Sequence, residues 1–187
     1  MKKTLLVAAS ILMSVFGFSQ LNGNYTVNAA QATGGTNYQT FTAAMSALVS
    51  NGVSGPVVFN CIQGTYNQQS NLSNANIAGT STTNTITFQS ASTNTNEVLW
   101  TYSSYPIYWY YCTFGNIKFD GIHFATTGTT NACIYLYFGT FTNATWTNCV
   151  IDGAVTASTS TTYAAFCSYY TTQNNLTVSN NEINNGS

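Results

Sequence analysis

Few residues of this chain could carry acid–base or metal chemistry. Lys118, Asp120 and His123 are close in sequence and could form a catalytic site; the alternative is a surface ion pair between Lys118 and Asp120 beside a solvated histidine on another face. Sugar hydrolysis needs two carboxyl groups together, and a calcium site needs several carboxylate oxygens. The remaining carboxylates are scattered along the sequence, at Glu97, Asp152 and Glu182. Asp152 is followed by a glycine, and we predict a turn there. The sequence therefore predicts no catalytic residue, no metal site and no cofactor.

The charge content restricts the partners. Only 4% of the 187 residues are charged, against about 25% in an ordinary soluble domain. Lys2 and Lys3 account for two of the three cations, and there is no arginine. Nucleic-acid affinity comes largely from Lys and Arg on phosphates, and attraction to anionic lipid needs basic clusters. We therefore expect neither a nucleic-acid partner nor a basic membrane-binding surface.

Tyrosines are better candidates for a functional site, in binding rather than catalysis. They recur at matching repeat positions, in one column of three and a second of two: Tyr110, Tyr137 and Tyr169, then Tyr108 and Tyr135. Tyrosine rings suit the apolar faces of sugars and are enriched at protein interfaces. We predict a tyrosine platform that binds glycan or a cell-surface protein. The alternative is a purely structural ladder, stabilised by cross-strand packing or covered by the loop after Asp152.

These positions belong to an imperfect repeat. Three segments align without gaps from Ile107, Ile134 and Phe166. The anchor positions are spaced by 29, 31, 27 and 32 residues, at Phe59, Phe88, Phe119, Trp146 and Val178. Apolar and polar residues alternate within each unit, which is the period of a β-strand. Repeats of this length indicate stacked structural units.

The repeat predicts an all-β fold, a parallel β-helix of about five coils of 27–32 residues with three short strands in each coil. Ile107, Trp109 and Tyr111 are expected to point inward, and Asn148 and Asn180 to form an internal ladder at a tight corner. An antiparallel sandwich is the alternative fold, but it does not explain why whole columns repeat at one unit spacing.

A helix is predicted before the coils. Phe41, Met45 and Leu48 share one helical face, Thr40 is a suitable N-cap, and Asn51-Gly52 ends the helix. A stack of coils exposes its first apolar layer, so a cap is needed there. We therefore expect an N-terminal strand and capping helix in residues 20–56 and coils in residues 57–187, with the coils truncated at the C-terminal end.

The first 19 residues have the features of a signal peptide. Lys2 and Lys3 precede an apolar run from Leu5 to Phe16, too short to span a bilayer, and small residues follow before Gln20. We predict an exported chain that is not inserted in a membrane after cleavage. The alternative is a buried helix of a cytosolic domain. The five cysteines match no metal-binding spacing, and we expect most of them to be small buried side chains.

The signal segment and several motifs resemble the start of large secreted proteins of bacteria that use type IX secretion. These motifs are Gly34-Gly35-Thr36-Asn37-Tyr38, Gly55-Pro56-Val57-Val58-Phe59-Asn60, Gly64-Thr65-Tyr66 and Asn84-Thr85-Ile86-Thr87-Phe88. Such proteins resemble right-handed β-helices of the pectate-lyase-like superfamily. The resemblance implies a right-handed β-helix at the cell surface or outside the cell, with an adhesive or structural role.

Two other functions are compatible with the repeat. The chain could be the non-catalytic N-terminal part of a larger polysaccharide-active lyase or hydrolase. Threonine columns such as Thr113, Thr140 and Thr172 also resemble those of ice-binding β-solenoids, although units of 27–32 residues are less regular than that function needs.

Overall fold

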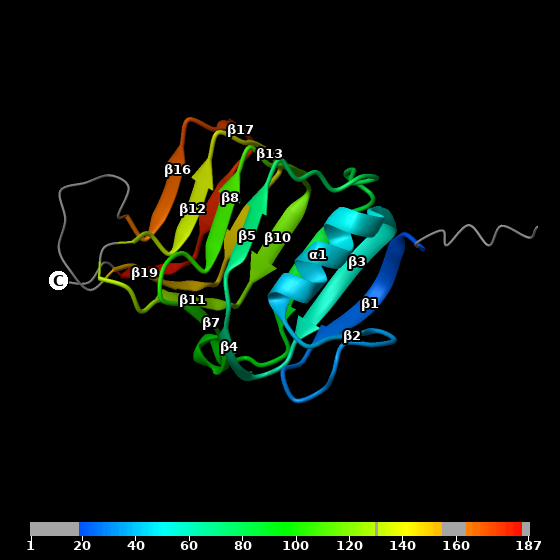
Figure 1. Ribbon diagram of the computed structural model, residues 1–187, viewed down its shortest axis with the longest axis horizontal. Coiled ribbons are helices and arrows are strands. Elements are labelled where there is room, and N and C mark those ends of the chain that lie inside the picture. Colours follow the sequence, from blue (N-terminus) through cyan, green and yellow to red (C-terminus); the bar gives the residue numbers. More distant parts are fainter. Residues whose placement is uncertain (1–18, 130, 155–163, 185–187) are drawn as a thin grey trace, which may run out of the picture.

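The structure, a computed structural model, describes residues 19–129, 131–154 and 164–184. These residues form a mostly β, parallel β-solenoid of about five turns with one short α-helix near the N-terminus (Figure 1). The predicted fold class, a parallel β-helix preceded by a helix, is confirmed. The predicted signal peptide, apart from its last residue, lies outside the described residues, as does most of the loop after Asp152.

Four sheets run along the solenoid, and all of their strands pair in parallel. The seven-stranded sheet contains, in spatial order, β18 (Thr177–Ser179), β14 (Thr145–Thr147), β10 (Ile117–Asp120), β6 (Ile86–Ser90), β3 (Val53–Cys61), β1 (Leu21–Val27) and β2 (Asn37–Tyr38). The five-stranded sheet contains β19 (Glu182–Asn184), β15 (Val150–Asp152), β11 (His123–Thr126), β7 (Val98–Tyr102) and β4 (Gly64–Asn67). The four-stranded sheet contains β16 (Phe166–Tyr169), β12 (Ile134–Tyr137), β8 (Ile107–Tyr110) and β5 (Ser70–Ser73). The three-stranded sheet contains β17 (Thr172–Asn174), β13 (Thr140–Thr142) and β9 (Thr113–Gly115), and a 3₁₀ turn, η1 (Thr95–Glu97), precedes β7.

The strand register confirms the repeat anchors. Each anchor lies beside the next one in the seven-stranded sheet, in the order Phe59, Phe88, Phe119, Trp146 and Val178. The first four anchor rings stack along the core with centroid distances of 4.4, 5.2 and 5.4 Å. Equivalent positions of successive coils therefore become neighbours, as the gapless alignment predicts.

The first coil has the predicted three short strands, β3, β4 and β5, but each of the three coils from β6 to β17 has four. The difference arises at Tyr111, Phe138 and Tyr170, which have φ values of 50–52°. This left-handed backbone turns the chain between the four- and three-stranded sheets. Tyr111 is consequently 47% exposed, so the prediction that it points inward is wrong. The next residue, Cys112, is buried instead.

The asparagine ladder lies at a different corner from the one predicted. Asn148 and Asn180 do adopt left-handed φ angles, but both are exposed, and Asn148 donates a hydrogen bond to Asp120. The ladder runs through the other asparagine column. Asn143 Nδ2 donates to Asn116 Oδ1 at 2.9 Å, and Asn175 Nδ2 donates to Asn143 Oδ1 at 3.0 Å. All three have φ values between 51° and 61°, a conformation that asparagine tolerates better than most residues.

The predicted helix, α1 (Phe41–Asn51), covers the first coils. The Thr40 hydroxyl accepts a hydrogen bond from the Ala43 amide at 3.0 Å, and Gly52 ends the helix with φ 68°. The helix lies beside β5 and packs over β1 (Figure 1). Its buried Phe41 ring stacks on Trp100 at 4.3 Å. The helix thus closes the apolar interior at the N-terminal end, as expected of a cap.

All five cysteines are buried and unpaired, at positions 61, 112, 133, 149 and 167. Burial raises the pKa of each thiol. The expectation of small buried side chains is confirmed for these cysteines.

Candidate functional site

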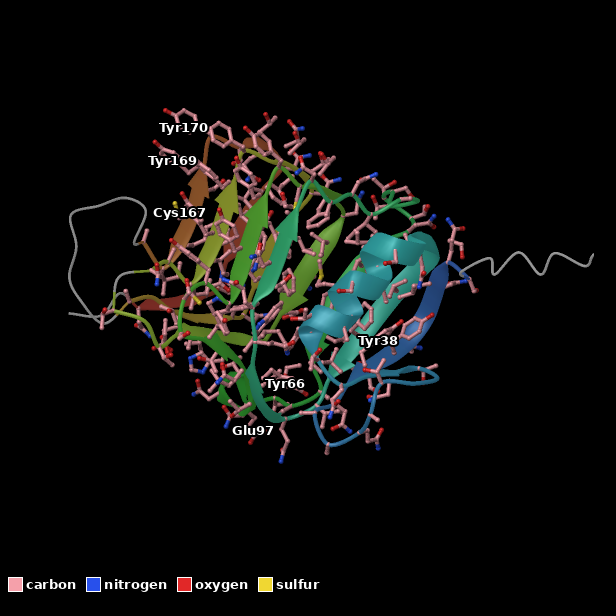
Figure 2. All side chains as sticks on the ribbon, in the orientation of Figure 1. Tyr38, Tyr66, Glu97, Cys167, Tyr169 and Tyr170 are labelled. Carbon is pink, nitrogen blue, oxygen red and sulfur yellow. The ribbon has the colours of Figure 1, made fainter. Side chains whose placement is uncertain are left out.

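The predicted tyrosine columns lie on the outer side of the four-stranded sheet. One column runs Ser73, Tyr110, Tyr137, Tyr169, and the other runs Asn71, Tyr108, Tyr135, Cys167. We call the outward side chains of Tyr108, Tyr110, Tyr135, Tyr137 and Tyr169 the tyrosine face. Figure 2 shows Cys167 and Tyr169 along β16, where these columns reach the last coil.

The rings of the tyrosine face stack on one another. Tyr110 and Tyr137 are 5.3 Å apart between centroids, Tyr137 and Tyr169 are 5.6 Å apart, and Tyr108 and Tyr135 are 5.7 Å apart. The interplanar angles are only 15–25°. Ring faces inside a column are therefore covered by the next ring. The face is a series of ring edges and hydroxyl groups rather than a flat platform of open rings.

Tyr135 is the most enclosed member of the tyrosine face. It is 8% exposed because the Tyr105 ring stacks against it at 5.1 Å and Cys167 lies beside it in the sheet. Burial, followed by the nearby Cys167 thiol and the neighbouring phenols, raises the pKa of Tyr135 to about 12. The Tyr135 hydroxyl therefore stays protonated at neutral pH and can donate a hydrogen bond.

An open hollow of about 340 Å³ lies where the columns change from small polar residues to tyrosines. Tyr108 follows Asn71 in its column, so its ring is the first of that stack. The hollow is lined only by uncharged side chains: Gln69, Asn71, Ser104, Tyr105, Tyr108, Tyr135 and Tyr137. Gln69 Nε2 donates to the Tyr105 carbonyl at 3.0 Å, which ties two walls together.

The sequence predicted three of these lining residues, namely Tyr108, Tyr135 and Tyr137. It missed Tyr105, which stacks on the tyrosine face from the segment before β8. It also missed the polar wall of Gln69, Asn71 and Ser104. The available signal was in the register, because Asn71 stands one coil before Tyr108.

The possible site of Lys118, Asp120 and His123 is not brought together. Lys118 and Asp120 form an ion pair of 2.7 Å on the seven-stranded sheet, as the structural alternative predicted. Partial burial disfavours the Asp120 carboxylate, but hydrogen bonds from Lys118 and Asn148 and the Lys118 charge outweigh it and lower the pKa of Asp120. His123 belongs to the five-stranded sheet and lies on another face of the solenoid.

The expectation of a solvated His123 is wrong. Its Nε2 lies 2.7 Å from Asp152 Oδ2, and its side chain is 15% exposed. Asp152 lies in strand β15 rather than in the predicted turn, and its Oδ1 accepts a hydrogen bond from Asn184 at 2.9 Å. The pair is diagonal, because Asp152 is beside Ala125 in the sheet. Column alignment alone could not show it.

Glu97 is also used locally. It accepts hydrogen bonds from Ser92 and Asn94 at the turn that precedes β7. In the described ranges, no group of three or more His, Cys, Asp or Glu side chains is placed to hold a metal ion. The threonine columns lie in register as predicted, although Lys118 precedes Thr145 and Thr177 in theirs.

Within the part of the chain that the structure describes, no helix is long and apolar enough to cross a membrane. The architecture is that of the parallel β-solenoids. No protein-family model, no curated protein and no solved structure matches the chain.

Proposed function

We propose that this chain is a secreted or cell-surface β-solenoid segment with an adhesive role, and that it binds neutral glycan in the hollow at the end of the tyrosine face. The observation that carries the proposal is the composition of that hollow, in which tyrosine rings and side-chain amides meet without a charged group. Export is inferred from the signal-like first 19 residues and remains part of the proposal.

Stacking favours this end of the face. A sugar ring packs best on an aromatic face, and ring faces within the columns are covered by the next coil. Tyr108 has Asn71 rather than another ring before it in the column. The small polar neighbour leaves room for a ligand where the stack begins.

Polar groups in the hollow suit a neutral sugar. Asn71 and Gln69 supply amide groups, Ser104 supplies a hydroxyl, and the tyrosines supply phenolic hydroxyls. Sugar hydroxyls both donate and accept hydrogen bonds, so amides and hydroxyls are matched partners. An acidic polysaccharide would need cations, and none lines the hollow. The proposal therefore selects neutral over acidic glycans.

The test is calorimetric titration of the purified protein with neutral oligosaccharides of glucose, mannose and N-acetylglucosamine, and with oligogalacturonate. We expect binding to at least one neutral oligosaccharide and none to oligogalacturonate. Tyr108→Ala should weaken that binding about tenfold, since a stacked ring contributes about 0.5–1.5 kcal/mol beyond its buried area. Tyr170→Ala is the matched control, because Tyr170 is 67% exposed and does not line the hollow.

Two results would overturn the proposal. One is the absence of binding to every neutral oligosaccharide by protein whose circular dichroism shows folded β-structure. The other is unchanged affinity of Tyr108→Ala. If Tyr108→Ala binds normally but melts at a lower temperature, the tyrosine face is a structural ladder only.

A further inference from the structure

The corner between the seven- and five-stranded sheets differs in one coil. In four coils a two-residue turn joins the two sheets, at residues 62–63, 121–122, 148–149 and 180–181. In the coil that contains β6 and β7, the connection is longer and runs through residues 91–97, which we call the β6–β7 loop. Insertions into a repeat form loops on one face of a solenoid, and that face is often the binding face. The β6–β7 loop therefore marks this corner as a candidate binding face.

Hydrogen bonds within the β6–β7 loop hold it in place. The Ser92 amide donates to Ser90 Oγ at 3.1 Å, and the Asn94 amide donates to Ser92 Oγ at 3.1 Å. The Asn96 amide donates to Asn94 Oδ1 at 3.1 Å, and the Ser92 hydroxyl donates to the carboxylate of Glu97. The 3₁₀ turn η1 lies beside β11 of the next coil, and Figure 2 shows Glu97 at the outer edge of the molecule. The loop is thus a fixed wall beside the next coil.

A second hollow, of about 470 Å³, lies between the β6–β7 loop and the coils that follow it. Its volume is in the range of small-molecule sites, about 300–1,000 Å³. The loop lines it with hydroxyl groups, from Ser92, Thr93 and Thr95. The following coils line it with a carboxylate, a buried glycine and an amide, from Asp120, Gly121 and Asn148.

Gly121 keeps the second hollow open. It has a φ of 68°, and a β-carbon at this position would lie 3.3 Å from the Ser90 β-carbon and 3.9 Å from Thr95 Cγ2. A side chain there would press against the loop and fill the space beside it. The glycine therefore lets the loop pack closely while its backbone lines the hollow.

Asp120 is the main hydrogen-bond acceptor in the second hollow. Its Oδ1 accepts from Asn148 Nδ2 at 2.8 Å, and its Oδ2 accepts from Lys118 Nζ at 2.7 Å. A carboxylate has about four acceptor positions, so about two remain for a ligand. The side chain is 28% exposed, so a ligand can reach it. Lys118 balances the charge of Asp120, which favours a neutral ligand over a cation.

The other polar groups of the second hollow both donate and accept. The hydrogen bonds that hold the loop do not use the hydroxyl groups of Thr93 and Thr95. The Asn148 amide uses one of its two protons on Asp120, and its oxygen is an acceptor. Such groups match the hydroxyl groups of a sugar, which also donate and accept.

We propose that the second hollow binds one sugar residue of a neutral glycan. Two neighbouring sugar hydroxyls donate to the Asp120 carboxylate, and Thr93, Thr95 and Asn148 bond to the others. None of the described side chains that line this hollow is aromatic, so hydrogen bonds rather than ring stacking provide the affinity. The proposal goes beyond glycan binding at the tyrosine face, because the second hollow lies on other sheets and either site can bind sugar alone.

A calcium ion fits the second hollow less well than a sugar. Calcium takes six to eight oxygen ligands, several of them from carboxylates. Asp120 supplies the one carboxylate that lines the hollow, and the Lys118 ammonium beside it repels a cation. The Glu97 carboxylate accepts hydrogen bonds from Ser92 and Asn94 and does not line the hollow.

The test is a nuclear magnetic resonance titration of the ¹⁵N-labelled full chain with the methyl glycosides of glucose, galactose and mannose, and separately with calcium chloride. We expect at least one glycoside to shift the backbone amide signals of Thr93, Thr95 and Gly121, and calcium chloride to leave them unchanged. Signals far from the hollow report in the same spectra whether each variant is folded.

Variants locate the binding. Asp120→Asn should weaken it about tenfold, because a hydrogen bond to a charged acceptor is about twice as strong as one to a neutral acceptor. The matched control is Glu182→Gln, which removes an exposed carboxylate on the five-stranded sheet and should leave the affinity unchanged. Thr95→Val should weaken binding at least about twofold, whereas Thr87→Val, on the seven-stranded sheet but outside this hollow, should not.

Tyr108→Ala separates this proposal from glycan binding at the tyrosine face. It should leave the shifts of Thr93, Thr95 and Gly121 unchanged, since Tyr108 does not line the second hollow. The second site is refuted if no neutral glycoside shifts these amides, or if Asp120→Asn binds with unchanged affinity. Shifts of the same amides with calcium chloride and with none of the glycosides would also refute it, because the hollow would then be a cation site.

Discussion

Asn143, the middle residue of the asparagine ladder, contributes to stability in two ways that different substitutions can separate. Asn143 donates to Asn116 at 2.9 Å, accepts from Asn175 at 3.0 Å, and has a φ of 51°. Asn143→Gly removes both side-chain hydrogen bonds but tolerates the left-handed backbone. Asn143→Ala removes the same bonds and also introduces a β-carbon at positive φ.

The size of each effect follows from these contacts. A neutral hydrogen bond contributes about 0.5–1.5 kcal/mol, and Asn143 is half-buried, so water replaces part of what is lost. We expect Asn143→Gly to lower the free energy of unfolding by about 1–2 kcal/mol. Asn143→Ala should lower it by about 1 kcal/mol more, because alanine is strained where φ is positive.

The assay is urea unfolding followed by tryptophan fluorescence, since Trp100, Trp109 and Trp146 are fully buried. The shift in midpoint at unchanged slope gives the change in free energy. Asn174→Ala is the control, because Asn174 is an exposed strand residue outside the ladder. Equal losses for glycine and alanine would refute the role of the left-handed corner. Wild-type stability of both variants would refute the ladder's contribution.

Three further predictions concern the core and two ionisable groups. Phe119→Ala should cost about 3–5 kcal/mol in urea unfolding because Phe119 is fully buried, whereas Val178→Ala should cost less than about 1 kcal/mol because Val178 is 39% exposed; similar losses would show that Val178 is covered in solution. Because the pKa of Tyr135 is raised to about 12, the folded state holds that proton longer than the unfolded state, and stability should fall between pH 10 and about 12. Tyr135→Phe should make this fall shallower, and an unchanged pH profile of the melting temperature would contradict the assignment. Because the pKa of Asp120 is lowered, its carboxylate stabilises the folded state above its ordinary pKa of 3.8, and this stabilisation is lost as the pH falls below that value. Asp120→Asn should therefore slightly reduce the fall of the melting temperature in acid, and an unchanged fall would exclude this role.

The repeat alignment predicted which residues become neighbours along the solenoid. Phe88, Phe119 and Trp146 occupy one column because equal positions of successive coils pair in parallel register. The same logic placed Tyr110, Tyr137 and Tyr169 side by side. Such predictions succeed because each coil contacts mainly its neighbours, so sequence spacing converts directly into position.

The same reasoning failed at the corners of the coils. The alternation of polar and apolar residues assigns Tyr111 to the interior, but its φ of 52° turns the chain at this corner and exposes the ring. An aromatic residue in this conformation is uncommon. Here the ring stacks on Phe138 at 5.2 Å, and Phe138 stacks on Tyr170 at 5.1 Å. Ring stacking between coils thus stabilises residues whose left-handed backbone is unfavourable. The polar–apolar pattern within one coil does not reveal this stacking.

By itself, the sequence determined the class of fold, the columns and the capping helix, because these depend on periodicity and on nearest-neighbour stacking. Only the tertiary structure decided which columns bond and where a ligand could enter. His123 meets Asp152 diagonally across two coils, and Tyr105 closes one wall of the hollow from a segment outside the aligned repeat. Such contacts depend on side-chain directions and on irregular segments between the repeats, and a repeat alignment contains neither.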